Sequence, residues 1–197
     1  MSIRRVTVYA ASSQALHVDY IKAASRLGET LAGAGISIVY GGGGRGLMGA
    51  MADGAIARGG RVDGIIPKFL TRVERGHQGL ASLEVVDTMR TRKERMLDHS
   101  DGVIALPGGC GTFEELFEVM TLKRLGQYLG PIVLVNTRGY YDGLMGFLKH
   151  SVHQHFMSPN HLDILQVVAE PEDVLDALGD APAWSADQLN EAAVRAP

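Results

Sequence analysis

Short apolar runs alternate with longer amphipathic segments along most of the chain. The apolar runs, four or five residues long, lie at residues 6–10, 36–40, 62–66, 83–86, 103–106, 132–135 and 165–169. We expect each run to form a buried strand. Strands that are apolar throughout are typical of parallel sheets whose two faces are both covered by helices.

The segments between these runs have the residue spacing of helices. The pattern predicts helices at residues 18–34, 47–57, 89–100, from 112 onward and at 141–156, with a short helix beginning at Pro171. Residues 68–82 are polar and contain glycine, so we expect a loop over the site. This alternation predicts an α/β fold, a three-layer sandwich with a mostly parallel central sheet. We expect one domain over residues 1–180 and a C-terminal tail over residues 181–197.

A glycine-rich turn, residues 107–112, joins the fifth predicted strand to the helix that follows it. Thr112 is a candidate N-cap for this helix. Its predicted apolar face consists of Phe113, Leu116, Phe117 and Met120. Free backbone amides and the positive end of the helix dipole would then meet in one place, which is a suitable site for a phosphate.

Glu115 has two possible roles at this turn. In a capping box, the Glu three residues after the N-cap reaches back to the N-cap amide, and Thr112 and Glu115 have this spacing. A carboxylate beside a phosphate site could instead face another part of the ligand, such as a sugar, and act in catalysis. The spacing alone leaves both interpretations open.

Composition excludes several classes of function. The formal charge of −3 and the 6% of aromatic residues argue against a general nucleic-acid binder. The single cysteine excludes an internal disulfide and a cysteine-rich zinc site, and it fits a reducing compartment. The first residues lead directly into a predicted strand without a signal-peptide core, and no apolar run is long enough to cross a bilayer. We expect a cytoplasmic protein with no membrane partner.

Three further motifs have ordinary explanations. Residues 44–49 match the dinucleotide fingerprint and Asp63 lies downstream, but the motif follows the second strand rather than the first. Cys110 could be a nucleophile at a helix N-terminus, but no histidine is assigned beside it, and we prefer the interpretation that a small residue fills a tight loop. His150 and His153 share a helical face but have no carboxylate to complete a ligand set. We therefore expect neither a metal nor a cofactor.

Four cations crowd the first turns of the helix that follows Met89; they are Arg90, Arg92, Lys93 and Arg95. Such a cluster is usually a solvated face. Because cations at a helix N-terminus oppose the helix dipole, however, an outside anion would relieve the repulsion. This favours a phosphate partner for Arg92 or Lys93.

Two motifs together resemble those of the LONELY GUY (LOG) family of cytokinin riboside 5′-monophosphate phosphoribohydrolases, also labelled lysine decarboxylase-like. Residues 107–115 match the family's PGGxGTxxE motif completely. Residues 89–93 match its Met-His-x-Arg-Lys pattern, except that Arg90 replaces the usual His. The resemblance covers residues 4–178, and the first loop has Ala10-Ala11 where Cys-Gly is common.

The resemblance implies a Rossmann-like fold, a homodimer, and hydrolysis of the N-glycosidic bond of a nucleoside 5′-monophosphate without a cofactor. The products would be a free base and ribose 5-phosphate. By position, Arg92 and Glu115 match the family's catalytic pair. The implied substrate contacts are Glu74, Arg92, Lys93, Gly109, Cys110, Gly111, Thr112, Phe113, Glu114, Glu115 and Thr121.

Other functions remain as alternatives on the same fold. An AMP-binding or carrier protein would bind the nucleotide without turnover, and a dinucleotide-dependent enzyme would use residues 44–49. The decarboxylase label has no support in the sequence, because nothing marks a Schiff-base lysine or its pyridine partner. Arg92 cannot serve as a general acid, since a guanidinium does not lose its proton in the working range.

Overall fold

Seven strands form one sheet in the order β4-β3-β2-β1-β5-β6-β7, and all of its pairings are parallel. The computed structural model describes residues 3–187. The strands are β1 Arg5–Tyr9, β2 Ser37–Tyr40, β3 Val62–Pro67, β4 Ser82–Val86, β5 Gly102–Ala105, β6 Ile132–Val135 and β7 Leu165–Val168. The predicted α/β fold with a mostly parallel sheet is confirmed.

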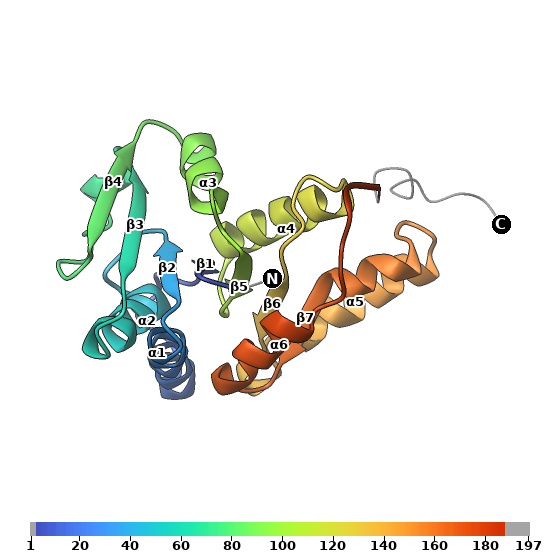
Figure 1. The fold of residues 1–197 in the computed structure, drawn as a ribbon, viewed down its shortest axis with the longest axis horizontal. Helices are drawn as coiled ribbons and strands as arrows, with labels where there is room; N and C mark the ends of the chain where they lie inside the picture. Colours follow the sequence, from blue (N-terminus) through green and yellow to red (C-terminus); the bar gives the residue numbers. More distant parts are fainter. Residues whose placement is uncertain (1–2, 188–197) are drawn as a thin grey trace.

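Helices cover both faces of the sheet (Figure 1). One face packs against α1 Val18–Gly33, α2 Gly46–Ala57 and α6 Val174–Asp180. The other packs against α3 Met89–Leu97, α4 Cys110–Arg124 and α5 Asp142–His153. Four 3₁₀ turns complete the described elements: η1 Leu70–Arg72, η2 Thr137–Gly139, η3 Pro159–Ile164 and η4 Pro171–Asp173.

The central strands are buried on both faces because alternate side chains enter the two helical layers. In β1, Val6 and Val8 pack with α1 and α2, whereas Tyr9 points toward α4. The edge strand β4 differs from the expectation of a buried strand. Leu83 and Val85 are 40% and 55% exposed, since a sheet edge lacks a neighbour on one side.

One predicted detail of α4 is wrong. Phe117, which we placed on the apolar face, is 40% exposed. The buried face instead contains Leu116 and Val119, and it also takes in Glu115 and Lys123. Sequence periodicity missed this face because two of its members are charged.

The first part of the predicted tail packs against α4. Trp184 Nε1 donates a hydrogen bond of 2.6 Å to the carbonyl of Lys123. The buried Lys123 ammonium in turn donates to the carbonyl of Gly130 at 2.7 Å. Residues 188–197 of the predicted tail lie outside the described residues, and the domain boundary after residue 180 stays a prediction.

The direction in which successive strands are added to the sheet reverses between β1 and β5. Strands β1 to β4 follow one another outward on one side, and β5 to β7 follow on the other. The loops after β1 and β5 therefore diverge, although the amide of Ala11 still donates to the carbonyl of Pro107 at 3.3 Å. Ligands of open α/β sheets bind at this kind of switch point, beyond the carboxyl ends of the strands.

Within residues 3–187, no helix combines enough length with enough apolar character to cross a bilayer.

Candidate active site

A cavity of about 610 Å³ opens at the switch point between β1 and β5. The loops after β1, β2, β3 and β5 and the first turns of α3 and α4 line it. Six of the residues that we predicted as substrate contacts lie on its wall: Glu74, Arg92, Gly109, Gly111, Thr112 and Glu115. Five segments of the chain thus meet in one concave, mixed polar and apolar site, which is typical of a small-molecule site.

The N-terminus of α4 opens into this cavity without a side-chain cap. The helix begins at Cys110 and its N-cap is Gly109, so the prediction that Thr112 caps the helix is wrong. Thr112 is the third helical residue and packs against Gly108, where a Cβ would lie 2.0 Å from the Thr112 hydroxyl. Within residues 3–187, no hydrogen bond occupies the amides of Cys110, Gly111 and Thr112. They are free to bind an anion.

Aromatic side chains hold the glycine turn through hydrogen bonds and ring stacking. Tyr140 donates a hydrogen bond to the carbonyl of Gly108, and Tyr141 donates one of 2.7 Å to the carbonyl of Leu106. The ring of Phe113 stacks on Tyr140 with an interplanar angle of 9°. The turn is therefore held in one conformation before any ligand arrives.

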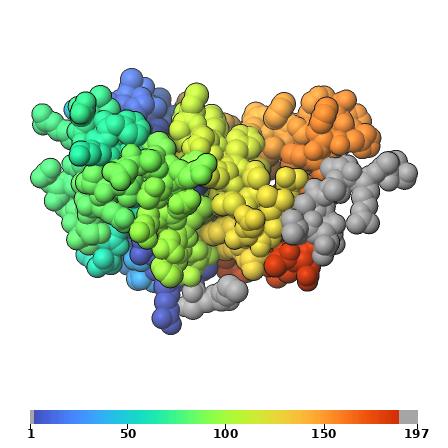
Figure 2. Space-filling model, turned by 90° about the horizontal axis from the view of Figure 1, so that it is seen from above, coloured from blue at the N-terminus to red at the C-terminus, as the bar shows by residue number. Residues whose placement is uncertain are grey.

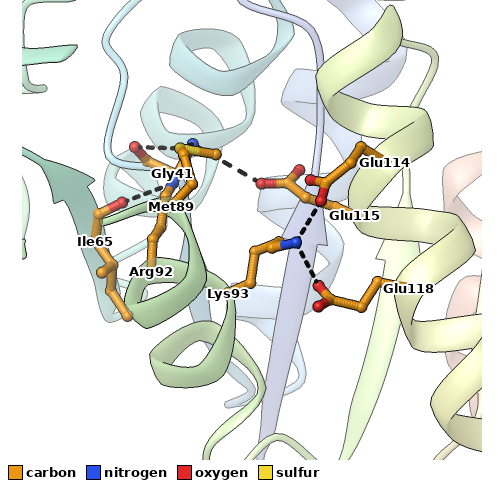
Figure 3. Close-up of polar contacts among 8 residues, drawn as sticks. All are labelled: Gly41, Ile65, Met89, Arg92, Lys93, Glu114, Glu115 and Glu118. Carbon is orange, nitrogen blue, oxygen red and sulfur yellow. Dashed lines mark hydrogen bonds and ion pairs between the residues drawn. The ribbon is translucent and has the colours of Figure 1, made fainter. Parts of the chain in front are cut away.

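Arg92 is buried at the wall of the cavity, with its guanidinium fixed by backbone carbonyls. Nε donates to the carbonyl of Ile65 at 3.1 Å, and Nη2 donates to the carbonyl of Gly41 at 3.3 Å. A Cβ at residue 41 would lie 1.9 Å from Nη2 of Arg92, so a larger residue there would displace the guanidinium. Figure 3 shows these contacts and the carboxylate of Glu115 across from the guanidinium.

Glu115 is 7% exposed, and its Oε1 lies 3.9 Å from Nη1 of Arg92. Burial raises the pKa of Glu115 to about 7, although the neighbouring Arg92 charge acts in the opposite direction. The capping-box interpretation is excluded, because Thr112 is not the N-cap of α4. A buried carboxyl group that titrates near neutral pH inside a cavity has the properties of a catalytic acid or base.

Lys93 lies beside Arg92 on α3 but does not line the cavity. Its ammonium is paired with Glu114 and with Glu118, the latter at 3.1 Å (Figure 3). These contacts join α3 to α4, which lie side by side in Figure 2 as green and yellow-green segments. The negative charge beside Lys93 therefore comes from two glutamates of the chain itself, and not from an outside anion.

Four other predicted contacts also lie off the cavity wall. Cys110 is exposed, and Glu114 is engaged with Lys93. Phe113 packs on Tyr140, and the hydroxyl of Thr121 donates to the carbonyl of Phe117. Their role in binding stays a prediction.

Sequence reasoning missed several residues of the wall, namely Tyr9, Arg45, Met48, Phe69, Leu70, Val73 and Met89. Arg45 is the N-cap of α2, and within residues 3–187 no ion pair or hydrogen bond engages its guanidinium. Burial, together with the charge of Glu115, raises the pKa of Tyr9 well above its usual range. The signal available for Arg45 was its place in a glycine loop after a strand.

The dinucleotide motif at residues 44–49 does not form a phosphate site. The amides of Leu47 and Met48, in the first turn of α2, both donate to the carbonyl of Ala11. Asp63, the candidate ribose ligand, instead accepts hydrogen bonds from Arg61 and Ser82. His150 and His153 are exposed, as the interpretation of a solvated helix end predicted, and the described residues contain no cluster suited to a metal ion.

Comparisons with known proteins point to one family. The sequence model of a family described as possible lysine decarboxylase matches residues 48–178. A cytokinin riboside 5′-monophosphate phosphoribohydrolase from Arabidopsis thaliana is 38% identical over 177 residues, which are 90% of this chain and 83% of the relative. One of the same name from Mycobacterium tuberculosis is 41% identical over 172 residues, covering 87% and 91%.

The chain belongs to the LOG family. Among solved structures, a molybdenum cofactor carrier protein from Chlamydomonas reinhardtii superposes with a TM-score of 0.70 over 91% of this chain and 98% of the carrier. At 18% identity, that likeness shows the Rossmann-like fold alone. The older decarboxylase label finds no support in the LOG site described above, since no lysine lines its cavity within residues 3–187.

The raised pKa of Glu115 predicts that Glu115→Gln stabilises the folded protein at alkaline pH. With a folded pKa of about 7 and an ordinary value of 4.5, the native state binds the proton more tightly, so ionisation costs stability as pH rises through this window. The variant should gain on the order of 1–3 kcal/mol at about pH 8 and little at about pH 5. Urea denaturation at both pH values measures this, and an equal gain at both would contradict it.

Proposed function

We propose that this protein hydrolyses the N-glycosidic bond of an adenosine 5′-monophosphate, with or without an N6 substituent, to a free base and ribose 5-phosphate. The relatives named as phosphoribohydrolases support this activity. The observation that carries it is the placement of Glu115, a buried carboxyl group, in the same cavity as the uncapped N-terminus of α4.

The 5′-phosphate would bind at the N-terminus of α4. The three free amides of residues 110–112 and the helix dipole favour a dianion there. The N-terminus of α2 is a poorer candidate, because the carbonyl of Ala11 already accepts from its first amides. Arg45 supplies a cation to the same cavity and has no carboxylate partner among the described residues.

Glu115 would act at the anomeric carbon. In the proposed reaction the bond from C1′ to the base nitrogen breaks, and the electron pair leaves with the base. Positive charge grows on the ribose, and a nearby carboxylate stabilises it. A water oxygen then bonds to C1′ and gives one proton to Glu115, while the departing base takes up a proton from solvent. Because its pKa is about 7, Glu115 can release its proton to solvent near neutral pH, which restores the carboxylate for the next turnover. Arg92 keeps its charge throughout, so its part is to hold Glu115 and the substrate.

An apolar part of the wall supports a modified base. Phe69, Leu70 and Val73 lie on the loop after β3, and Met89 begins α3. An apolar N6 substituent would be removed from water against these side chains, which favours its binding. This fits the cytokinin nucleotides that the relatives' names describe.

A homodimer in the cytoplasm is part of the same proposal. The family resemblance suggests the dimer, and exposed aromatic side chains at Phe117 and Phe147, on α4 and α5, offer apolar surface for it. The single cysteine supports a reducing compartment.

Chromatography of the products from AMP and an N6-prenylated AMP tests the activity directly. We expect free base and ribose 5-phosphate in equal amounts, without an added cofactor. Intact nucleotide after incubation, together with measurable binding, would instead support the alternative of an AMP-binding or carrier protein.

Removal of the Glu115 carboxylate should abolish most of the turnover. We expect Glu115→Gln to lower kcat for AMP by about 10²–10³, the usual cost of losing one electrostatic group. In the unmodified enzyme, kcat/KM should rise with pH through about 7, since only the ionised carboxyl stabilises the cation. A profile that is flat in this range, or the same in the variant, would contradict this role.

The position of the Arg92 guanidinium should depend on residue 41 being a glycine. Gly41→Ala places a Cβ 1.9 Å from Nη2, so the guanidinium must leave its carbonyl partner. We expect kcat/KM for AMP to fall by about 10²-fold, because a small misplacement of the groups that orient a substrate has this effect. Gly33→Ala is the control, since a Cβ there meets no atom within 4 Å. Equal activity of the two variants would refute the role of Arg92.

A further inference from the structure

The loop between β3 and β4 is fastened to the glycine loop after β2. The amide of Gly44 donates to the carbonyl of Arg75 at 3.1 Å, and the amide of His77 donates to the carbonyl of Gly42 at 3.0 Å. An antiparallel bridge between Gly43 and Gly76 lies between these two contacts. Backbone contacts alone therefore bring the two loops together at the rim of the cavity.

The side chain of His77 adds a second attachment, to α2. Its Nδ1 accepts a hydrogen bond of 3.0 Å from the amide of Gly79, and its Nε2 lies 2.9 Å from Oδ1 of Asp53. Because an amide can only donate, Nδ1 carries no proton and Nε2 donates to the carboxylate. The side chain of His77 is 13% exposed and that of Asp53 is 74% exposed. The imidazole is thus held by both nitrogens in one tautomer.

This attachment lies three residues from Glu74. The carboxylate of Glu74 lines the cavity, and its Oε1 lies 3.0 Å from the position that a Cβ on Gly43 would take. The amide of Glu74 donates to the carbonyl of Leu70 at 2.8 Å. This bond attaches Glu74 to the 3₁₀ turn η1, whose Leu70 belongs to the apolar part of the cavity wall. His77 does not line the cavity itself.

We propose that His77 is a positioning residue, which with Asp53 sets Glu74 and the turn at residues 69–73 against the substrate. The choice of substrate probe rests on the proposed function. A histidine with one acceptor and one donor nitrogen fits this place, because it joins a loop amide to a helix carboxylate across a fixed distance. The loop that carries Glu74 is then already ordered, so substrate binding does not have to overcome the entropy cost of fixing a long loop.

The test compares KM and kcat for AMP in single variants. His77→Ala should raise KM about tenfold and change kcat less than about threefold, because a contact made equally in ground and transition states acts on binding. His77→Asn keeps an acceptor for the Gly79 amide and should recover part of the loss. Asp53→Ala, which alters a residue outside the cavity, should raise KM in the same direction. Glu29→Ala removes another exposed carboxylate, paired with Arg58 just after α2, and should change neither constant.

A double variant separates positioning from a merely structural role. If His77 acts through Glu74, His77→Ala should have little further effect on KM in a Glu74→Gln background. Independent effects of the two substitutions, or equal losses in kcat for His77→Ala and Glu29→Ala, would overturn the proposal.

Two readouts keep this inference distinct from the proposed function. If the unmodified protein binds AMP but does not cleave it, the proposed function fails and the dissociation constant of AMP replaces KM in the same comparison. The ¹⁵N chemical shifts of the His77 ring report its tautomer without any substrate. We expect the proton on Nε2, and a proton on Nδ1 of the neutral ring would overturn the proposal.

Discussion

The site depends on the burial of one guanidinium next to one carboxyl group. Removing Arg92 and Glu115 from water is costly, and the attraction between two buried charges alone seldom compensates for it. The fold compensates with the carbonyls of Ile65 in β3 and of Gly41, which directly follows the neighbouring strand β2. Because these carbonyls hold the guanidinium independently of Glu115, we expect Arg92 to stay in place whether or not Glu115 is ionised. The carboxyl group can therefore gain and lose a proton near pH 7 while the cavity keeps its shape.

The N-termini of α2 and α4 both lie at the cavity, and their hydrogen bonds give them different roles. At α2 the carbonyl of Ala11 already accepts from the first amides, so this helix fixes the loop after β1. At α4 the first amides are free, and the turn before them is held by Tyr140 and Tyr141. This asymmetry explains why a motif that resembles a dinucleotide fingerprint is structural here, whereas the turn after β5 is the proposed anion site.

Local sequence signals predicted the fold and placed several residues of the candidate site. The alternation of apolar runs and helices defines a parallel sheet, and the glycine turn at residues 107–112 follows a strand at its carboxyl edge, so both could be located without coordinates. The start of α4 was misplaced by three residues, because the capping-box spacing of Thr112 and Glu115 favoured Thr112 as the N-cap, whereas Gly109 serves as one. Contacts between distant segments could not be predicted: Lys93 is paired with Glu118 only because α3 packs on α4. Likewise, Asp53 and His77 are 24 residues apart and meet only through the path of the β3–β4 loop.

A crystal structure of Glu115→Gln with bound AMP would test the central claim most directly, since the substitution should slow cleavage and keep the shape of the cavity. The account predicts the phosphate on the amides of residues 110–112, with the side chain at residue 115 in contact with the anomeric carbon. A phosphate bound elsewhere, or an anomeric carbon turned away from residue 115, would contradict it.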